Sequence, residues 1–350
     1  MEFIVQNALQ NPQQDAFQVG QANIKVVGVG GAGSNMVSWL YKKGIKGAEI
    51  VACNTDKQHI DMTSSDHKFL IGKTITRGLG CGGFPSKGAE AANESLSEIK
   101  QCIQNTDMVF VCAGMGGGTG TGAAPVVAQI AKDQGAIVLG TVTMPFKIER
   151  ARIDKAEFGL QQLRSVCDTV IVIDNNRLVN IAGNLPVQQA FAVANELIST
   201  MIRGIVETIS VPSLVNLDFA DVKAVMKNGG VAAIGVGASD TNNKVTEAVN
   251  GALQNPLLDI KYAGASGALI HIEGGSDLTL DDVNQIGEKI TENLDPDANV
   301  IWGARVSDEM IGKLTVMTII TGVKSPWILG KHDSEEEKTK VGDELGIDIV

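Results

Sequence analysis

Short apolar runs and longer stretches of helical periodicity alternate through the first half of the chain. From Ile24 the apolar runs are IKVVGVG, EIVACN, MVFVCAG, AIVLGTVTM and TVIVID, and helices are expected from about Ser34 and from about Ala123. Continuous β-branched runs, each followed by a crossover, are typical of parallel strands that helices cover on both faces. The pattern therefore predicts a doubly wound, parallel-sheet α/β domain over residues 24–185.

A different pattern follows this domain. Residues 186–210 carry apolar side chains at helical spacing and on more than one side, which predicts a long central helix suited to burial between two domains. Beyond Val225 the order strand, helix, strand, helix, strand, strand predicts a smaller α+β domain over residues 211–325. Residues 1–23 are expected to form a flexible extension, and residues 326–350 a charged tail with an apolar end.

Charge and residue usage exclude several classes of protein. The chain has 29 Lys+Arg against 40 Asp+Glu, a net charge of -11, which argues against a nucleic-acid partner because phosphate binding needs clustered cations. Its five cysteines include no CxxC pair and its four histidines are dispersed, so we expect neither a disulfide framework nor a zinc site, and a reducing cytoplasm fits best. We see no signal peptide, and no apolar run has the length of a membrane span.

The first of three glycine-rich loops joins a predicted strand to a predicted helix. Residues 28–35 read GVGGAGSN and contain GxGxxG, in which glycines let backbone amides approach a phosphate at a helix N-terminus. Asp56, about twenty residues on, is placed where a dinucleotide fold has its ribose-binding acid. A dinucleotide-dependent oxidoreductase is therefore an open alternative on these residues.

The second glycine loop is more informative. Residues 114–122, GMGGGTGTG, lie between the strand MVFVCA and a helix that we expect to hold Pro125 in its first turn. No Lys or Arg occurs between Lys100 and Lys132, so this is not a Walker loop, and a phosphate there must be held by backbone N–H groups, threonine hydroxyls and the helix dipole. A third glycine-rich turn, residues 77–85, could close over the terminal phosphate.

These motifs together resemble the FtsZ branch of the tubulin and FtsZ family of self-assembling GTPases. The resemblance runs from about Ile24 to Val323 and is carried by GVGGAGSN, GLGCGGFPSKG, AGMGGGTGTGAAPVVA, the PF..E segment, NLDFADVKAVM and GALIHIEG. It implies the fold of that family, GTP and GDP as ligands, and Mg²⁺ held mainly by phosphates and water. The spacing after the PF segment and the short tail look more like an archaeal member.

The resemblance also implies which residues surround the nucleotide. The GTP phosphates, including the terminal one, would be surrounded by residues of the three loops: Gly31, Ala32, Gly33, Ser34, Asn35, Gly82, Gly116, Gly117, Gly118, Thr119 and Gly120. Glu149 looks like the ribose-binding residue. Asn175 and Asn195 look like the guanine contacts, with Phe191 stacked on the base; amides suit a purine edge because each offers a donor and an acceptor. The family has Glu-Gly-x-x-Arg where this chain has Glu149-Arg150-Ala151-Arg152, so Arg152 is expected to face the nucleotide, with Arg150 the alternative.

The segment that follows the central helix carries the catalytic expectation. Taken alone, Asp218 and Asp221 are typical of the cap and first turn of a helix. In the family this loop reaches the nucleotide of the next subunit, which implies that Asn216, Asp218 and Asp221 polarise the attacking water. Asn54 and Asp56 lie on a loop that is expected to approach the nucleotide and its metal.

What the resemblance implies for biology is a cytoplasmic filament that forms the division ring at midcell. A head-to-tail contact that does not close propagates into a filament, so the main partner is a further copy of the chain. A membrane-anchoring division protein is expected to bind the tail at Leu345, Ile347, Ile349 and Val350, since nothing in the chain is expected to insert in a membrane itself. A nucleotide-dependent scaffold without significant hydrolysis is the second alternative that the residues leave open.

Overall fold

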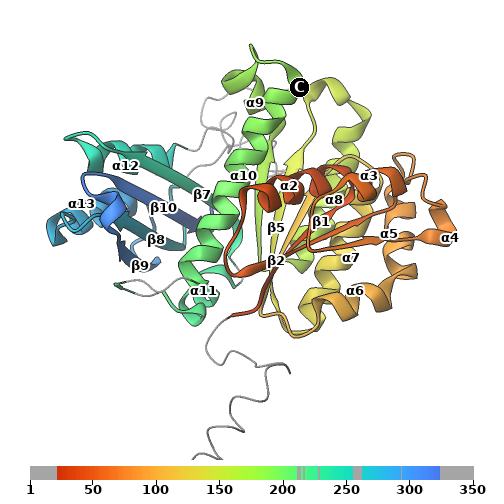
Figure 1. Cartoon of the computed structure of the whole chain (residues 1–350), viewed down its shortest axis with the longest axis horizontal. Coiled ribbons are helices and arrows are strands. Elements are labelled where there is room, and N and C mark those ends of the chain that lie inside the picture. Colours follow the sequence, from red (N-terminus) through yellow and green to blue (C-terminus); the bar gives the residue numbers. More distant parts are fainter. Residues whose placement is uncertain are drawn as a thin grey trace, which may run out of the picture.

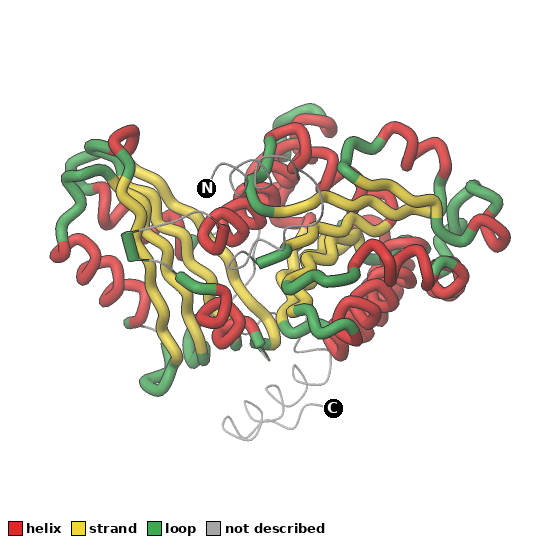
Figure 2. The backbone as a smooth tube through the Cα atoms, turned by 60° about the horizontal axis from the view of Figure 1, so that its bottom comes forward, coloured by secondary structure: helices red, strands yellow, loops and turns green. Residues whose placement is uncertain are grey.

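The computed structural model describes residues 22–210, 214–215, 217–227, 229–254, 262–292 and 294–323. The described strands join in one ten-stranded order, which a narrow junction of two residue pairs divides into two twisted parts, the first and the second sheet. These parts lie on either side of one long helix (Figures 1 and 2). Tail residues 345–350, the N-terminal extension up to residue 21 and Asn216 lie outside the described residues.

The first sheet is parallel, as predicted for a doubly wound domain. Its strands lie in the order β3-β2-β1-β4-β5-β6, and every neighbouring pair is parallel. The strands are β1 (Ile24–Val29), β2 (Ala48–Asn54), β3 (His67–Leu70), β4 (Met108–Gly114), β5 (Ile137–Met144) and β6 (Thr169–Asp174). All six therefore present their carboxyl ends at one edge, where a doubly wound fold places its ligands.

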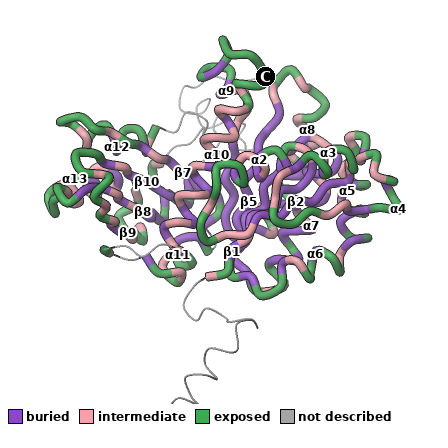
Figure 3. Tube along the Cα trace, viewed as in Figure 1, coloured by how far each residue is buried: buried purple, intermediate pink, exposed green. Residues whose placement is uncertain are grey.

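Helices cover both faces of this sheet. Alternate strand residues enter different cores: Val26 packs in the cluster that contains Leu40 of α2, whereas Val27 packs in the cluster that contains Val127 of α7. The helices are α2 (Gly30–Lys43), α3 (Lys57–Met62), α4 (Lys73–Thr76), α5 (Pro85–Glu94), α6 (Leu96–Ile103), α7 (Thr119–Asp133), α8 (Ala151–Val166) and α9 (Asn175–Ala182), with a 3₁₀ turn at Lys147–Glu149. The strand interiors are accordingly almost wholly buried (Figure 3).

The predicted central helix is present as α10 (Val187–Ser210). Its buried residues include Ile198 and Ile202, which share one apolar cluster with Phe110 of the first sheet and Ile270 of the second. A single core thus crosses from one sheet to the other through this helix. Among the described residues, none of the helices has both the length and the apolar content needed to cross a membrane.

The second sheet is mixed, and its elements come in the predicted order. β10 lies between β7 and β8 and is antiparallel to both, while β9 pairs in parallel with β8. The elements are α11 (Phe219–Met226), β7 (Gly230–Ser239), α12 (Lys244–Leu253), β8 (Gly267–Gly274), α13 (Leu280–Thr291), β9 (Asn299–Val306), a 3₁₀ turn at Asp308–Met310, and β10 (Leu314–Thr321). Only two residue pairs, Thr169 with Gly230 and Val170 with Val231, join β6 to β7.

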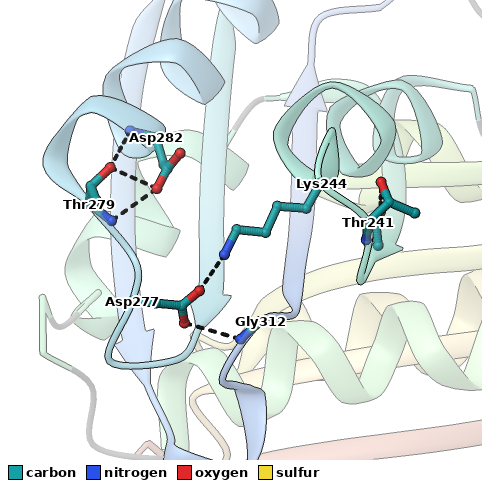
Figure 4. A network of polar contacts seen from close by, with 7 residues as sticks. Thr241, Lys244, Asp277, Thr279, Asp282 and Gly312 are labelled. Carbon is teal, nitrogen blue, oxygen red and sulfur yellow. Dashed lines mark hydrogen bonds and ion pairs between the residues drawn. The ribbon is translucent and has the colours of Figure 1, made fainter.

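A polar network holds the outer loops of this second sheet (Figure 4). Lys244 Nζ, at the start of α12, donates to Asp277 at 2.6 Å, and the Gly312 N–H donates to the same carboxylate at 3.2 Å. Beside it, the Thr279 hydroxyl accepts from the Asp282 N–H and caps α13. These contacts explain why the pKa of Asp277 lies below its ordinary value: first the hydrogen bond from Lys244, then that from Gly312.

Two predicted helix starts were wrong, both in the same direction. α2 begins at Gly30 rather than near Ser34, and α7 begins at Thr119 rather than near Ala123. Pro125 is therefore inside α7, not in its first turn as expected. The reason is that the glycine-rich segments, residues 30–33 and 119–122, have no apolar periodicity and themselves form the first turns of the two helices.

Candidate functional site

The three glycine loops converge at the carboxyl edge of the first sheet. Gly30 has φ +72°, and a Cβ placed on it would lie 2.7 Å from the Gly120 nitrogen, so the first two loops touch through backbone. A Cβ on Gly118 would lie 2.6 Å from Cys81 Cβ, which brings the third loop against the second. Side chains would force these loops apart, and the glycines are the reason that they can meet.

Buried hydroxyls hold the loops together. Thr55 Oγ1, just after β2, and Thr119 Oγ1, in the second loop, are 2.6 Å apart, and Cys81 Sγ lies 3.4 Å and 3.5 Å from them. The Gly116 N–H donates to Thr121 Oγ1 at 2.9 Å. The threonine hydroxyls thus act within the protein, which leaves phosphate binding chiefly to backbone N–H groups.

The same edge is built to attract an anion. The N-termini of α2 and α7 both lie there, and neither helix has an acidic residue in its first turn. Helix N-termini carry unpaired N–H groups and partial positive charge, which suit phosphate. Ser34 is fully buried in α2 with its Oγ lacking a hydrogen-bond partner, and a Cβ on Gly117 would meet nothing within 4 Å, so both positions could take a ligand contact. Of the other predicted phosphate residues, Gly31 is half-buried, Gly33 is buried, and Ala32, Asn35 and Gly82 are exposed.

The predicted ribose residue lies in a tight turn beyond β5. Glu149 Oε1 accepts from the Phe146 N–H at 2.9 Å, and Glu149 Oε2 accepts from Arg152 Nη1 at 2.6 Å. Arg150 adopts φ +42°, a backbone conformation that side chains rarely take, at the junction with α8. Arg152 is the arginine that pairs with Glu149, and its carbonyl oxygen lies 2.9 Å from a Cβ placed on Gly116, against the second loop.

The predicted guanine contacts lie on α9 and α10. Asn175 is half-buried and begins α9 directly after β6. Phe191 is 43% exposed and meets Phe146 edge-on with ring centroids 6.1 Å apart. Asn195 is half-buried one turn further along α10, on the same side as Phe191 because residues four apart share a helix face. The first turns of α10 therefore belong to the carboxyl edge of the first sheet.

The predicted catalytic carboxylates are not brought to this edge. The end of α10 lies at the opposite, amino edge of the sheet, since a Cβ on Gly47, just before β2, would lie 2.2 Å from Ser210 Oγ. Asp218 and Asp221 follow that end and form a capping box on α11: Asp218 Oδ1 accepts from the Asp221 N–H at 2.7 Å, and Asp221 Oδ2 accepts from the Asp218 N–H at 3.3 Å. Figure 1 shows α9 and α11 at opposite ends of α10.

Sequence reasoning missed one residue of the first-loop region, His59. Its Nε2 lies 3.0 Å from Asn35 Oδ1, and its Nδ1 lies 3.3 Å from Asn54 Nδ2. Lys155 was also missed; its Nζ donates to the Gly83 carbonyl at 2.8 Å and ties α8 to the third loop. Asp56 caps α3 through the His59 N–H at 3.0 Å. The histidine gave no signal in the sequence because its partner Asn35 is 24 positions away.

Burial keeps two cysteine thiols of this region protonated. Burial raises the pKa of Cys53 and of Cys112, on the strands beneath the loops, to about 12, so both stay protonated. In the described ranges, no three His, Cys, Asp or Glu residues come together as a potential metal site. Asp56, at the N-terminus of α3 on this edge, is a carboxylate of the kind that binds Mg²⁺ together with phosphate oxygens and water, and its Oδ1 already accepts from the His59 N–H.

Both parts of the chain match known families. Residues 23–183 match the family described as "Tubulin/FtsZ family, GTPase domain", and residues 230–324 match "FtsZ family, C-terminal domain". The chain is 54% identical over 349 residues to "Cell division protein FtsZ 2" of Methanocaldococcus jannaschii, covering 95% of this chain and 91% of that protein. It is 52% identical over 345 residues to the protein of the same name from Halobacterium salinarum, covering 96% and 88%.

Solved structures agree with the sequence relatives. The "FtsZ dimer, empty" of M. jannaschii superposes with a TM-score of 0.80 at 47% identity and covers 92% of both chains. CetZ2 from Haloferax volcanii, solved as a GTPγS-bound protofilament, shares the fold with a TM-score of 0.75 at 22% identity. The dinucleotide-dependent oxidoreductase considered on the first loop is thereby rejected. The chain belongs to the FtsZ branch of the tubulin/FtsZ family and is a GTPase of that family.

Proposed function

We propose that this GTPase is a cell-division protein that assembles head to tail and hydrolyses GTP between successive subunits. Its relatives from M. jannaschii and H. salinarum are named as cell division proteins. GTP is held at the carboxyl edge of the first sheet of one subunit, and the Asp218/Asp221 loop of the next subunit completes the site. The proposal also takes residues 24–185 as the GTP-binding domain, residues 186–210 as the central helix and residues 211–325 as the C-terminal domain.

The distance between the two halves of the site carries the proposal. α10 has 24 residues and is about 36 Å long at ~1.5 Å per residue. Phe191 near its start belongs to the nucleotide edge, whereas Asp218 and Asp221 follow its far end. Within one chain the carboxylates lie far from the loops, so a second copy must supply them if they act on the nucleotide. Such a contact joins two different surfaces and repeats into a filament.

The proposed binding mode assigns one task to each group of residues. The backbone of the glycine loops and the N-termini of α2 and α7 hold the phosphates through Gly31, Ala32, Gly33, Ser34, Asn35, Gly82, Gly116, Gly117, Gly118, Thr119 and Gly120. Glu149 and Arg152, already paired at 2.6 Å, face the ribose and phosphate side. Asn175 and Asn195 read the guanine edge, and Phe191 offers its exposed ring to the base.

The proposed chemistry is attack by a water on the γ-phosphorus. Asp218 and Asp221 orient this water by accepting its hydrogen bonds, with Asn216, outside the described residues, assisting. The bond from the γ-phosphorus to the β–γ bridging oxygen breaks, and GDP keeps that oxygen. Mg²⁺ would neutralise phosphate charge when it is bound. Loss of the γ-phosphate then weakens the contact between subunits, because that group lies in the contact.

The place in the cell is part of the same proposal. Filaments would form a ring at midcell in the cytoplasm. A membrane-anchoring partner would bind the tail at Leu345, Ile347, Ile349 and Val350, which lie outside the described residues.

Phosphate release from GTP with Mg²⁺, measured against protein concentration together with light scattering, tests the split site. Release per subunit should be negligible at low concentration and should rise together with scattering. A constant rate per subunit without assembly would show that one chain holds the complete site.

The capping box dictates which variants to use. Asp221→Ala removes the carboxylate but also a cap contact, at a cost of about 1 kcal/mol in stability. Asp218→Asn and Asp221→Asn keep one side-chain oxygen for the cap, remove the charge and replace the second oxygen with an N–H₂ donor. These variants are expected to bind GTP and form long-lived filaments with strongly reduced release. Undiminished turnover in both would refute the assignment.

A nucleotide-dependent scaffold is favoured by one observation. Both carboxylates are already engaged in capping α11, which is a sufficient structural reason for their presence. GTP-dependent scattering without phosphate release would support the scaffold.

A further inference from the structure

We propose that His59 is a positioning residue that orients the Asn35 amide, so that Asn35 presents its N–H₂ donor to the bound guanine nucleotide. This inference rests on the proposed function, because it takes Asn35 to be a nucleotide contact. His59 lies on α3, and Asn35 lies on α2 in the segment that begins with the first glycine loop. Asn54, His59 and Asn35 form a chain of three side chains, each of which fixes the next.

Asn54 is the fixed end of this chain. It is 2% exposed, and its Oδ1 accepts from the Thr55 N–H at 2.8 Å and from the Asp56 N–H at 3.3 Å. A backbone N–H can only donate, so the atom that receives both bonds must be the amide oxygen. The Asn54 Nδ2 donor is therefore the atom that faces His59.

The ring of His59 follows from this orientation. Its Nδ1 lies 3.3 Å from Asn54 Nδ2, a group that can only donate, so Nδ1 must accept and carries no hydrogen. The proton of the neutral ring is then on Nε2, which lies 3.0 Å from Asn35 Oδ1 and donates to it.

The rest of His59 is held in place as well. Its N–H donates to Asp56 Oδ1 at 3.0 Å, and its carbonyl accepts from Thr63 Oγ1 at 2.8 Å. Its Cε1 lies 3.3 Å from where a Cβ on Gly31 would stand, so the ring is packed against the first turn of α2.

The consequence falls on Asn35. With Oδ1 engaged by His59, the exposed amide has its two N–H groups left for another partner. A donor at this position suits an acceptor atom of the nucleotide, such as a phosphate or sugar oxygen. Without the ring, the amide is free to turn its oxygen outward, and an oxygen facing such an acceptor is repelled.

Two substitutions separate this role from simple packing. His59→Leu keeps an apolar body but removes both hydrogen bonds. His59→Gln offers an N–H donor and an oxygen acceptor two bonds apart, as the neutral ring does. Asn35→Ala removes the proposed contact itself. Each variant, and the Asn35→Ala/His59→Leu double variant, is titrated with fluorescently labelled GDP at concentrations where scattering reports no assembly.

His59→Leu is expected to weaken GDP binding about three- to tenfold, the effect of one hydrogen bond, and His59→Gln to stay within about twofold of the unsubstituted chain. The double variant should bind as Asn35→Ala does, because both changes remove the same contact. Nitrogen-15 NMR of the labelled imidazole should show a protonated Nε2 and an unprotonated Nδ1. This measurement needs no variant to fold.

The outcomes are distinguishable. A ring protonated on Nδ1, unchanged GDP binding in His59→Leu, or additive losses in the double variant would overturn this inference while the proposed function stands. If the unsubstituted, folded chain binds no guanine nucleotide, the proposed function fails and this inference fails with it.

Discussion

One histidine is expected to make the fold sensitive to mild acid. His271 of β8 faces a narrow cavity of about 110 Å³ between α10 and the second sheet, lined also by Arg203, Glu207 and Arg305. Its Nδ1 is buried without a hydrogen-bond partner. Burial, and secondly the charge of Arg305, lower the pKa of His271 from 6.5 to about 4.

The sign and size of the effect follow from this lowered pKa. Below pH 6.5 the unfolded chain binds a proton at His271, whereas the folded chain stays neutral until pH falls to about 4. The unfolded state is therefore favoured progressively between these values, and the stability is fully present above 6.5. Each tenfold difference in proton affinity between the two states corresponds to about 1.4 kcal/mol, so the loss from His271 alone should reach about 3 kcal/mol.

Urea denaturation of the nucleotide-free chain and of His271→Gln, at steps from pH 7 to pH 4, measures the effect. Carboxylates titrate in both proteins and cancel in the difference of their free energies of unfolding. That difference should move by about 3 kcal/mol in favour of the variant as the pH falls. Arg305→Gln is the matched control: it should raise the pKa of His271 only modestly, because burial is the larger cause. Parallel curves for the chain and His271→Gln, or an NMR titration midpoint near the ordinary histidine value, would refute the reasoning.

Two further predictions concern the loops of the nucleotide edge. A Cβ on Gly33 would lie 2.2 Å from the Cys112 carbonyl oxygen, so Gly33→Ala should force α2 away from β4. The free energy of unfolding in urea should fall by about 3 kcal/mol or more, and binding of labelled GDP should weaken. Unchanged stability would contradict this packing. Thr119→Val leaves the buried Thr55 hydroxyl with only the weak Cys81 thiol as a hydrogen-bond partner and should cost about 1–3 kcal/mol. Thr119→Ser should cost less, and equal losses in the two variants would show that the hydroxyl pair is not the cause.

Periodicity predicted the elements whose burial depends on apolar stripes. α10, five of the six strands of the first sheet and the order of the second sheet follow from the spacing of apolar residues, whereas the short, partly exposed β3 was not predicted. The helices α5 and α6, between the third loop and β4, were not predicted. α5 packs on α7 through small residues: a Cβ on Gly88 would lie 2.4 Å from the Gly118 carbonyl oxygen. Close packing of glycine and alanine in α5 leaves no apolar stripe to read, whereas α6 has one, with Ile99 and Ile103 buried at helical spacing, and was nevertheless missed.

The site was predictable as a place but not as a set of contacts. The glycine motifs and the strand order indicate that three loops meet at one edge, and the backbone contacts of Gly30 and Gly118 agree. The partners of individual side chains were beyond reach, because they depend on tertiary neighbours. His59 bonds to Asn35 across 24 positions, and nothing in the spacing of the histidines suggests it.

The proposed division of labour between subunits depends on how firmly the two ends of one chain are held relative to each other. The sheets themselves contribute little to this, since β6 and β7 share only two residue pairs. α10 contributes most, because its buried face belongs to a core that includes residues of both sheets. At Gly204 the helix comes so close to the second sheet that a Cβ would lie 2.4 Å from Met317 Sδ. The separation between the nucleotide loops and the Asp218/Asp221 loop is therefore set chiefly by the packing of α10. The geometry of the shared site should respond to changes along α10 before it responds to changes in the sheet junction.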